Sequence, residues 1–114
     1  MPFWSVAPVN EEPEIGLRRW QVIETERGEH HFVGQSIASG SGRVSSAITS
    51  FDIQNRTGQT RSGRRYTLIG QPGYDPDGMH TWGIWALANN VTQQTNVSSQ
   101  YLAPEDADDG TPTT

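Results

Sequence analysis

Apolar and polar residues alternate along much of the segment between residues 17 and 70, and turn-forming residues interrupt the alternation at short intervals. In the first run Trp20 and Val22 fall on one side of an extended chain, and Gly28 then supplies a turn before the next large apolar residue, Phe32. A two-residue period broken by glycine-rich turns is typical of antiparallel strands joined by short connections. The pattern therefore predicts five short strands in sequential order, a β-meander.

The third predicted strand, "GRVSSAITSFD" over residues 42–52, carries serine where a core strand usually carries large side chains. Its two parities do not separate into an apolar and a polar side. We expect Val44, Ile48 and Phe51 to lie in the core or at its rim, and the serines to lie where the sheet meets water or another backbone. Because a small sheet hides its edges by curling, the predicted fold is mainly β, of the α+β class, as a five-stranded SH3-like or OB-like barrel.

A helix is predicted after the sheet, because Asp75 is a good N-cap and Pro76 suits the first helical position. Large apolar side chains then recur at three- and four-residue spacing until the Asn-Asn pair at residues 89–90, which ends the pattern. We expect this helix to pack on the sheet, with Trp82 and Trp85 covering one end of it.

The sequence divides into a folded centre and two acidic ends. Residues 1–16 form a predicted acidic extension, residues 17–90 a single small β domain with its helix, and residues 91–114 a polar and acidic tail that we expect to be disordered. Phe3 and Trp4 are costly to leave in water, so we expect them to pack on the domain or on a partner.

Composition limits the protein to one small core, since only 32% of its 114 residues are hydrophobic. There is no cysteine, which excludes disulfides and thiolate chemistry. No signal-like or membrane-spanning apolar run is present, so we expect a soluble, cytoplasmic protein that does not engage membranes.

Charge is segregated along the chain, although the net value is -5. All eight basic residues are arginines between residues 17 and 70, and four acidic residues in that segment leave it at +4. Both flanks are acidic. The basic centre is the part of the chain on which we look for a binding surface.

Catalytic and metal-binding patterns are absent from the sequence. His30 and His31 are neighbours that face opposite sides of a strand, and we expect them and His80 to be ordinary histidines rather than metal ligands. The chain lacks a nucleophile elbow, a phosphate-binding loop and a complete calcium loop. We therefore predict no enzyme activity, no cofactor and no metal.

Binding is the remaining class of function, and we expect it on an arginine-rich face of the sheet. The candidate contact residues are Arg43, Arg61, Arg64, Arg65 and Tyr66. Arginine and tyrosine are common anchors in protein interfaces, so we predict a non-enzymatic protein-binding module. Two alternatives stay open: a nucleic-acid-binding barrel with an autoinhibitory acidic tail, because arginine stripes with stacking rings also hold single strands, and a structural subunit of a larger assembly. The sequence leaves the oligomeric state open.

A resemblance gives this prediction a setting. The string W-x-V-x-x-T-x-x-G-x-x-H from Trp20 to His31, followed by "GRVSSAI", "TRSGRRYTLIGQPGYD" and the tryptophan pair, resembles small hypothetical proteins of bacteria and their phages or prophages. The resemblance spans residues 17–90 and implies no particular activity or site residue. It implies an accessory role, such as inhibition of a host system.

Overall fold

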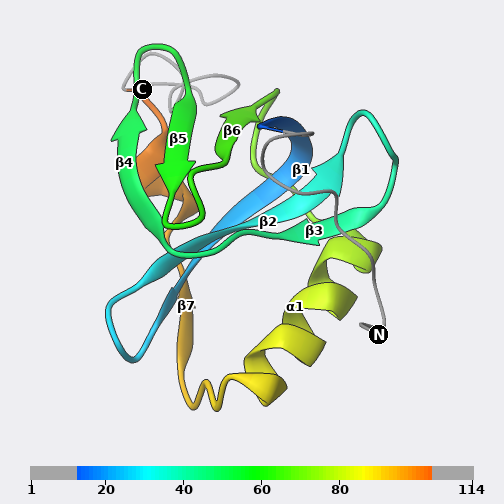
Figure 1. Cartoon of the computed structure of the whole chain (residues 1–114), viewed down its shortest axis with the longest axis vertical. Helices are drawn as coiled ribbons and strands as arrows, with labels where there is room; N and C mark the ends of the chain where they lie inside the picture. Colours follow the sequence, from blue (N-terminus) through cyan, green and yellow to red (C-terminus); the bar gives the residue numbers. More distant parts are fainter. Residues whose placement is uncertain (1–12, 104–114) are drawn as a thin grey trace, which may run out of the picture.

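The computed structural model describes residues 13–103 and consists mainly of β-strands, with one α-helix (Figure 1). In chain order the elements are β1 (Glu14–Thr25), β2 (His30–Ser36), β3 (Gly42–Val44), β4 (Ile48–Asp52), β5 (Thr57–Thr60), β6 (Arg65–Leu68), α1 (Pro76–Ala88), β7 (Gln94–Asn96) and the 3₁₀ helix η1 (Ser98–Tyr101). The prediction of a mainly β protein with one helix is confirmed.

The sheet has the order β3-β2-β1-β6-β5-β4, with β7 also paired to β1. The pairs β1–β2, β2–β3, β4–β5 and β5–β6 are antiparallel, as in a meander. However, the first half of β1 runs parallel to β6, while its second half pairs with β7. The sheet is therefore open, mixed and seven-stranded. The predicted five-stranded antiparallel meander is wrong, and its closure into an SH3-like or OB-like barrel is not confirmed. Strand β1 is long enough for its two halves to have different neighbours on the same side.

Strand β1 keeps apolar side chains in the core along both halves because it contains a bulge. The register with β2 shifts between Arg18 and Gln21, and Arg19 takes a left-handed conformation with φ of 49°. An extra residue reverses the alternation, so Leu17 before the bulge and Trp20 after it both point inward.

The predicted third strand is broken into β3 and β4 at Ser45, which is 1% exposed. The backbone amide of Ser45 donates to the Phe32 carbonyl, and its hydroxyl accepts a hydrogen bond from the Phe32 amide at 2.9 Å. The Ser45 hydroxyl thus takes the place of a main-chain carbonyl as the acceptor for the Phe32 amide of β2. The chain turns there instead of continuing along the sheet.

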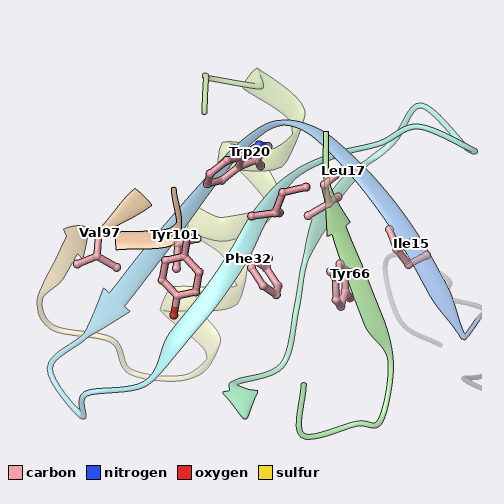
Figure 2. Packing of buried hydrophobic residues seen from close by; sticks show 9 residues of the cluster. Ile15, Leu17, Trp20, Phe32, Tyr66, Val97 and Tyr101 are labelled. Carbon is pink, nitrogen blue, oxygen red and sulfur yellow. The ribbon is translucent and has the colours of Figure 1, made fainter. Parts of the chain in front are cut away.

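Two apolar clusters lie on opposite sides of the β1–β2 ribbon. The larger one joins Trp20, Phe32, Tyr66 and Tyr101 with smaller aliphatic side chains (Figure 2). The smaller one is built around Trp82 and lies beneath α1. Both faces of the ribbon are covered, which explains why the buried residues of β2 run nearly continuously rather than alternating.

Helix α1 starts where the sequence predicts, since the Asp75 carboxylate accepts a hydrogen bond from the Gly78 amide at 2.8 Å. Its first turn lies almost directly on the backbone of β2 and β3. A Cβ atom at Gly42 would lie 2.4 Å from the carbonyl carbon of Asp77, and one at Gly78 would lie 2.8 Å from the Gly34 carbonyl oxygen. Glycine at these positions permits the close contact between helix and sheet.

The segment after α1 differs from the expected disordered tail as far as residue 103. Gln94–Asn96 forms β7, and Val97, Tyr101 and Ala103 are buried. The Tyr101 hydroxyl lies 2.6 Å from Nδ1 of His30, and the Tyr101 ring lies 4.7 Å from that of Phe51. The three buried side chains anchor this segment. Their spacing follows neither the period of a helix nor that of a strand, so the sequence pattern does not reveal them.

The domain also begins earlier than expected, because β1 starts at Glu14. The expectations for residues 1–12, including Phe3 and Trp4, and for the acidic residues after 103 lie outside the described residues.

Candidate functional site

The five predicted contact residues do not form a single face. Arg43 lies in β3, Arg61 follows β5, Arg64 directly precedes β6, and Arg65 and Tyr66 lie in β6. The structure brings Arg43, Arg64 and Tyr66 together at one cleft and separates Arg61 and Arg65 from it.

This cleft, of about 490 Å³, lies where β3 and the start of β6 face one side of α1. It is lined by Ser41, Gly42, Arg43, Val44, Ser46, Ser62, Arg64, Tyr66, Thr81 and Trp85. We call it the arginine cleft. Two guanidinium groups, three serines, a threonine and two aromatic rings contribute to its walls, and none of the described lining residues is acidic.

The aromatic walls of the arginine cleft are held from behind. The Trp85 ring is stacked on Trp82 at 5.2 Å with an interplanar angle of 22°, and the Tyr66 ring lies 5.5 Å from that of Phe32. Both supporting rings belong to the buried clusters. Because their supports are buried, Trp85 and Tyr66 present fixed surfaces to the cleft.

Arg64 is 7% exposed, so it does not lie on an open basic face as the sequence suggested. Alternation in β6 points Tyr66 inward and Arg65 outward, and Arg64 shares the parity of Tyr66. A guanidinium group is a rigid fork of donors that fits two oxygens of a carboxylate or phosphate. In low-dielectric surroundings such contacts are stronger than in water. The cleft is thus suited to an anionic group carried by a partly apolar ligand.

Arg61 and Arg65 each form an ion pair with a glutamate at the surface. Arg61 lies 2.9 Å from Oε2 of Glu29, and this hydrogen bond is the main reason that the pKa of the Glu29 carboxyl lies below its usual value. Arg65 lies 3.0 Å from Oε2 of Glu14. These two arginines do not extend the arginine cleft into a continuous basic stripe.

The buried residue His31 lies behind the wall of the arginine cleft. The sequence predicted an ordinary histidine and did not predict its place beside the cleft. Its ring lies 4.5 Å from that of Trp85, and its Nδ1 donates a hydrogen bond to the Ser45 carbonyl at 2.9 Å. Nε2, 3.6 Å from Oε1 of Glu29, has no hydrogen-bond partner in the described structure. Burial lowers the pKa of His31, and the hydrogen bond to Ser45 and the charge of Glu29 act in the opposite direction.

This histidine does not form a nucleophilic pair. The Ser45 hydroxyl is engaged by the Phe32 amide and the Ser46 carbonyl, and His31 contacts Ser45 only through its carbonyl oxygen. A serine nucleophile requires a hydrogen bond between its hydroxyl and the base. The nearest histidine and serine therefore lack the geometry for acyl transfer.

A second depression, of about 560 Å³, lies over β4, β5 and β6 and is more open than the arginine cleft. Its polar lining includes Glu14 and Arg65, which already form an ion pair. Within residues 13–103, no group of three or more histidine or acidic side chains is arranged to hold a metal ion. In the same residues no helix is long and apolar enough to cross a membrane.

No protein-family model, curated protein or solved structure matches this chain. A functional assignment therefore depends on the chemistry of the arginine cleft itself.

Proposed function

We propose that the protein is a non-enzymatic binding module that holds an acidic segment of a partner protein in the arginine cleft. The observation that carries this proposal is the convergence of Arg43 from β3, Tyr66 from β6 and Arg64 from just before β6 on one cleft that α1 completes with Trp85. Buried aromatic rings with arginine are the combination that dominates binding energy in protein interfaces.

The charge arrangement favours a protein over a nucleic acid. A nucleic-acid groove needs several cations that track successive phosphates. Here Arg61 and Arg65 lie apart from the arginine cleft, and the cleft groups only two guanidinium groups at one place. Two grouped cations suit one or two carboxylates better than a phosphate chain.

Selection of peptides provides a direct test. A random peptide library is panned against the immobilised full chain, and the affinity of each selected peptide is measured by fluorescence anisotropy. We expect enrichment of aspartate and glutamate. Replacement of Arg43 by glutamine should weaken binding about tenfold or more, because a hydrogen bond to a charged group contributes roughly 1.5–3 kcal/mol. The matched control is Arg27→Gln, which removes a half-exposed arginine that pairs with Glu26 outside the cleft.

Two results would contradict the proposal. One is a selected set without acidic enrichment, or with equal affinity for the wild type and the Arg43→Gln variant. The other is tight, salt-sensitive binding of labelled single-stranded or duplex oligonucleotides in the same assay, which would establish the nucleic-acid alternative. The accessory role in a phage or prophage and the cytoplasmic location rest on the sequence alone and stay predictions.

A further inference from the structure

Two successive arginines of β1 converge on one uncharged oxygen atom. Nε of Arg18 and Nη2 of Arg19 donate to Oε1 of Gln35 at 2.6 and 2.7 Å. The Gln35 amide is held in this orientation, because its nitrogen donates to the Gly40 carbonyl at 3.0 Å. Side chains of successive strand residues normally point to opposite faces. At the bulge, the left-handed conformation of Arg19 brings both guanidinium groups to the same oxygen.

This arrangement is an anion-binding position that a neutral group fills. Two guanidinium groups at one acceptor repel each other, and an amide oxygen carries no net charge that would offset the repulsion. Among residues 13–103, Asp75 is the one carboxylate within ion-pair distance of either arginine, with its Oδ1 3.6 Å from Nε of Arg19. A carboxylate in place of the Gln35 amide would accept both hydrogen bonds and add the missing charge. The position therefore fits an anionic oxygen better than the neutral one.

The face of the sheet around this position lies beyond the start of α1. In β2, His31 and Val33 point to the face that α1 covers, and Gln35 shares their parity. Ile37 continues that face next to β1, because its amide donates to the Gly16 carbonyl and its Cδ1 would lie 3.4 Å from a Cβ atom at Gly16. Ile37 is nevertheless 47% exposed. The helix therefore covers only part of this face.

A second exposed isoleucine lies on the other side of β1. Leu17 of β1 and Leu68 of β6 are buried partners in the parallel pair. The residues that follow them, Arg18 and Ile69, therefore point outward side by side. Ile69 is 46% exposed. The arginine pair thus has a half-exposed aliphatic side chain on each side of its strand.

Tyr74 completes this surface at the start of α1. It is 63% exposed and directly precedes Asp75, whose carboxylate contacts Arg19. Three of the four large apolar residues that are exposed within residues 13–103 therefore lie around the two arginines. A group of exposed apolar side chains around arginines is typical of an interaction site. We call it the bulge surface, formed by Arg18, Arg19, Ile37, Ile69 and Tyr74.

We infer that the bulge surface binds an acidic segment of a partner protein, with one carboxylate at the position that Oε1 of Gln35 now takes and an apolar side chain on Ile37 or Ile69. The charge of the two arginines favours an anionic partner. The aliphatic flanks favour a protein over a nucleic acid, because successive phosphates need a row of cations. This inference concerns a second surface and does not depend on the arginine cleft.

The probes are acetylated peptide amides with a glycine-serine background. Each carries one glutamate and one leucine, and the set varies their separation and order. Matched peptides replace the glutamate by glutamine or the leucine by serine. Binding to the ¹⁵N-labelled full chain is followed by NMR at low ionic strength. We expect the best glutamate-leucine peptide to shift the amides of Arg18, Gln35, Ile37 and Ile69, and both matched peptides to bind more weakly.

The variant Gln35→Glu supplies the carboxylate from within the chain. It should fill the position without loss of melting temperature and bind the best peptide about fivefold more weakly than the wild type. Arg18→Gln, which removes one donor, should weaken the same peptide by a similar factor. The matched control is Gln100→Glu, which adds the same charge at an exposed glutamine of η1 and should keep the wild-type affinity.

The failures of this inference and of the proposed function are distinguishable. Shifts confined to Ser62, Arg64 and Tyr66 would place the peptide in the arginine cleft alone, so that the proposed function stands and the inference is wrong. Wild-type affinity in both Gln35→Glu and Arg18→Gln, or no binding by any peptide of the set, would overturn the inference. Binding of labelled oligonucleotides that Gln35→Glu abolishes would assign the bulge surface to nucleic acid and overturn it as well.

Discussion

Replacing Ser45 by alanine tests whether a single hydroxyl divides the third predicted strand and shapes the wall of the arginine cleft. The Ser45 hydroxyl accepts a hydrogen bond from the Phe32 amide at 2.9 Å and donates one to the Ser46 carbonyl at 2.7 Å. Alanine removes both contacts without adding bulk. The Phe32 amide, on a residue that is 0% exposed, would lose its acceptor in a place that water does not reach.

The expected cost follows from that buried amide. An unsatisfied buried donor costs about 1–3 kcal/mol, and the lost bond to the Ser46 carbonyl adds up to about 1 kcal/mol, since Ser46 is partly exposed and water can replace the donor. We therefore expect Ser45→Ala to lower the free energy of unfolding by about 2–3 kcal/mol. For a domain of this size the melting temperature should fall by roughly 10–20 °C.

The measurement is urea unfolding followed by tryptophan fluorescence, with thermal unfolding by circular dichroism as a second probe. The matched control is Ser46→Ala, whose hydroxyl accepts a hydrogen bond from the solvent-exposed Ser62 amide at 3.1 Å. It should cost less than about 1 kcal/mol, because water can replace this acceptor. Equal destabilisation by the two substitutions, or a loss below about 0.5 kcal/mol for Ser45→Ala, would refute the role assigned to the Ser45 hydroxyl.

Three further predictions concern other parts of the molecule. The pKa of His31 is lowered in the folded state, so as the pH falls the unfolded chain binds a proton before the folded protein does. The free energy of unfolding of the wild type should therefore decrease between about pH 7 and 5.5, and the urea midpoint of His31→Gln should lack this decrease. Gly42→Ala should destabilise by about 1–3 kcal/mol because its Cβ meets the backbone of α1, whereas Gly83→Ala should stabilise the helix by about 0.5–1 kcal/mol; thermal unfolding that reverses this order would contradict the packing described. Arg65→Ala should cost less than about 1 kcal/mol and leave peptide affinity unchanged in the anisotropy assay, and a tenfold loss of affinity would move the site to β6.

Local signals in the sequence were sufficient for some of the fold. Asp75 and Pro76 mark the start of α1 through capping chemistry that acts within one helical turn. The turn at Gly28 and the antiparallel pairs of neighbouring strands also follow from short-range patterns. In each case the residues that determine the structure lie close together in the sequence.

The rest depends on contacts between distant residues. The parallel pairing of β1 with β6 joins residues 51 positions apart, and no periodicity within either strand encodes it. The candidate residues Arg61 and Arg64 show the same limit, because one pairs with Glu29 at the surface while the other is buried at the arginine cleft. The sequence predicts that Trp85 covers one end of the sheet, and only the position of α1 shows that it also lines the cleft.

The central place of β1 has a consequence for folding. One side of β1 pairs early with β2, but the other side needs β6 and β7, and the Val22 amide bonds to a hydroxyl 76 residues further along the chain. Loop closure over such distances is slow, so the β1–β2 hairpin should form well before its second edge is covered. During synthesis that uncovered edge is a template for pairing with other chains. The protein is therefore most vulnerable to aggregation in the interval before β7 leaves the ribosome.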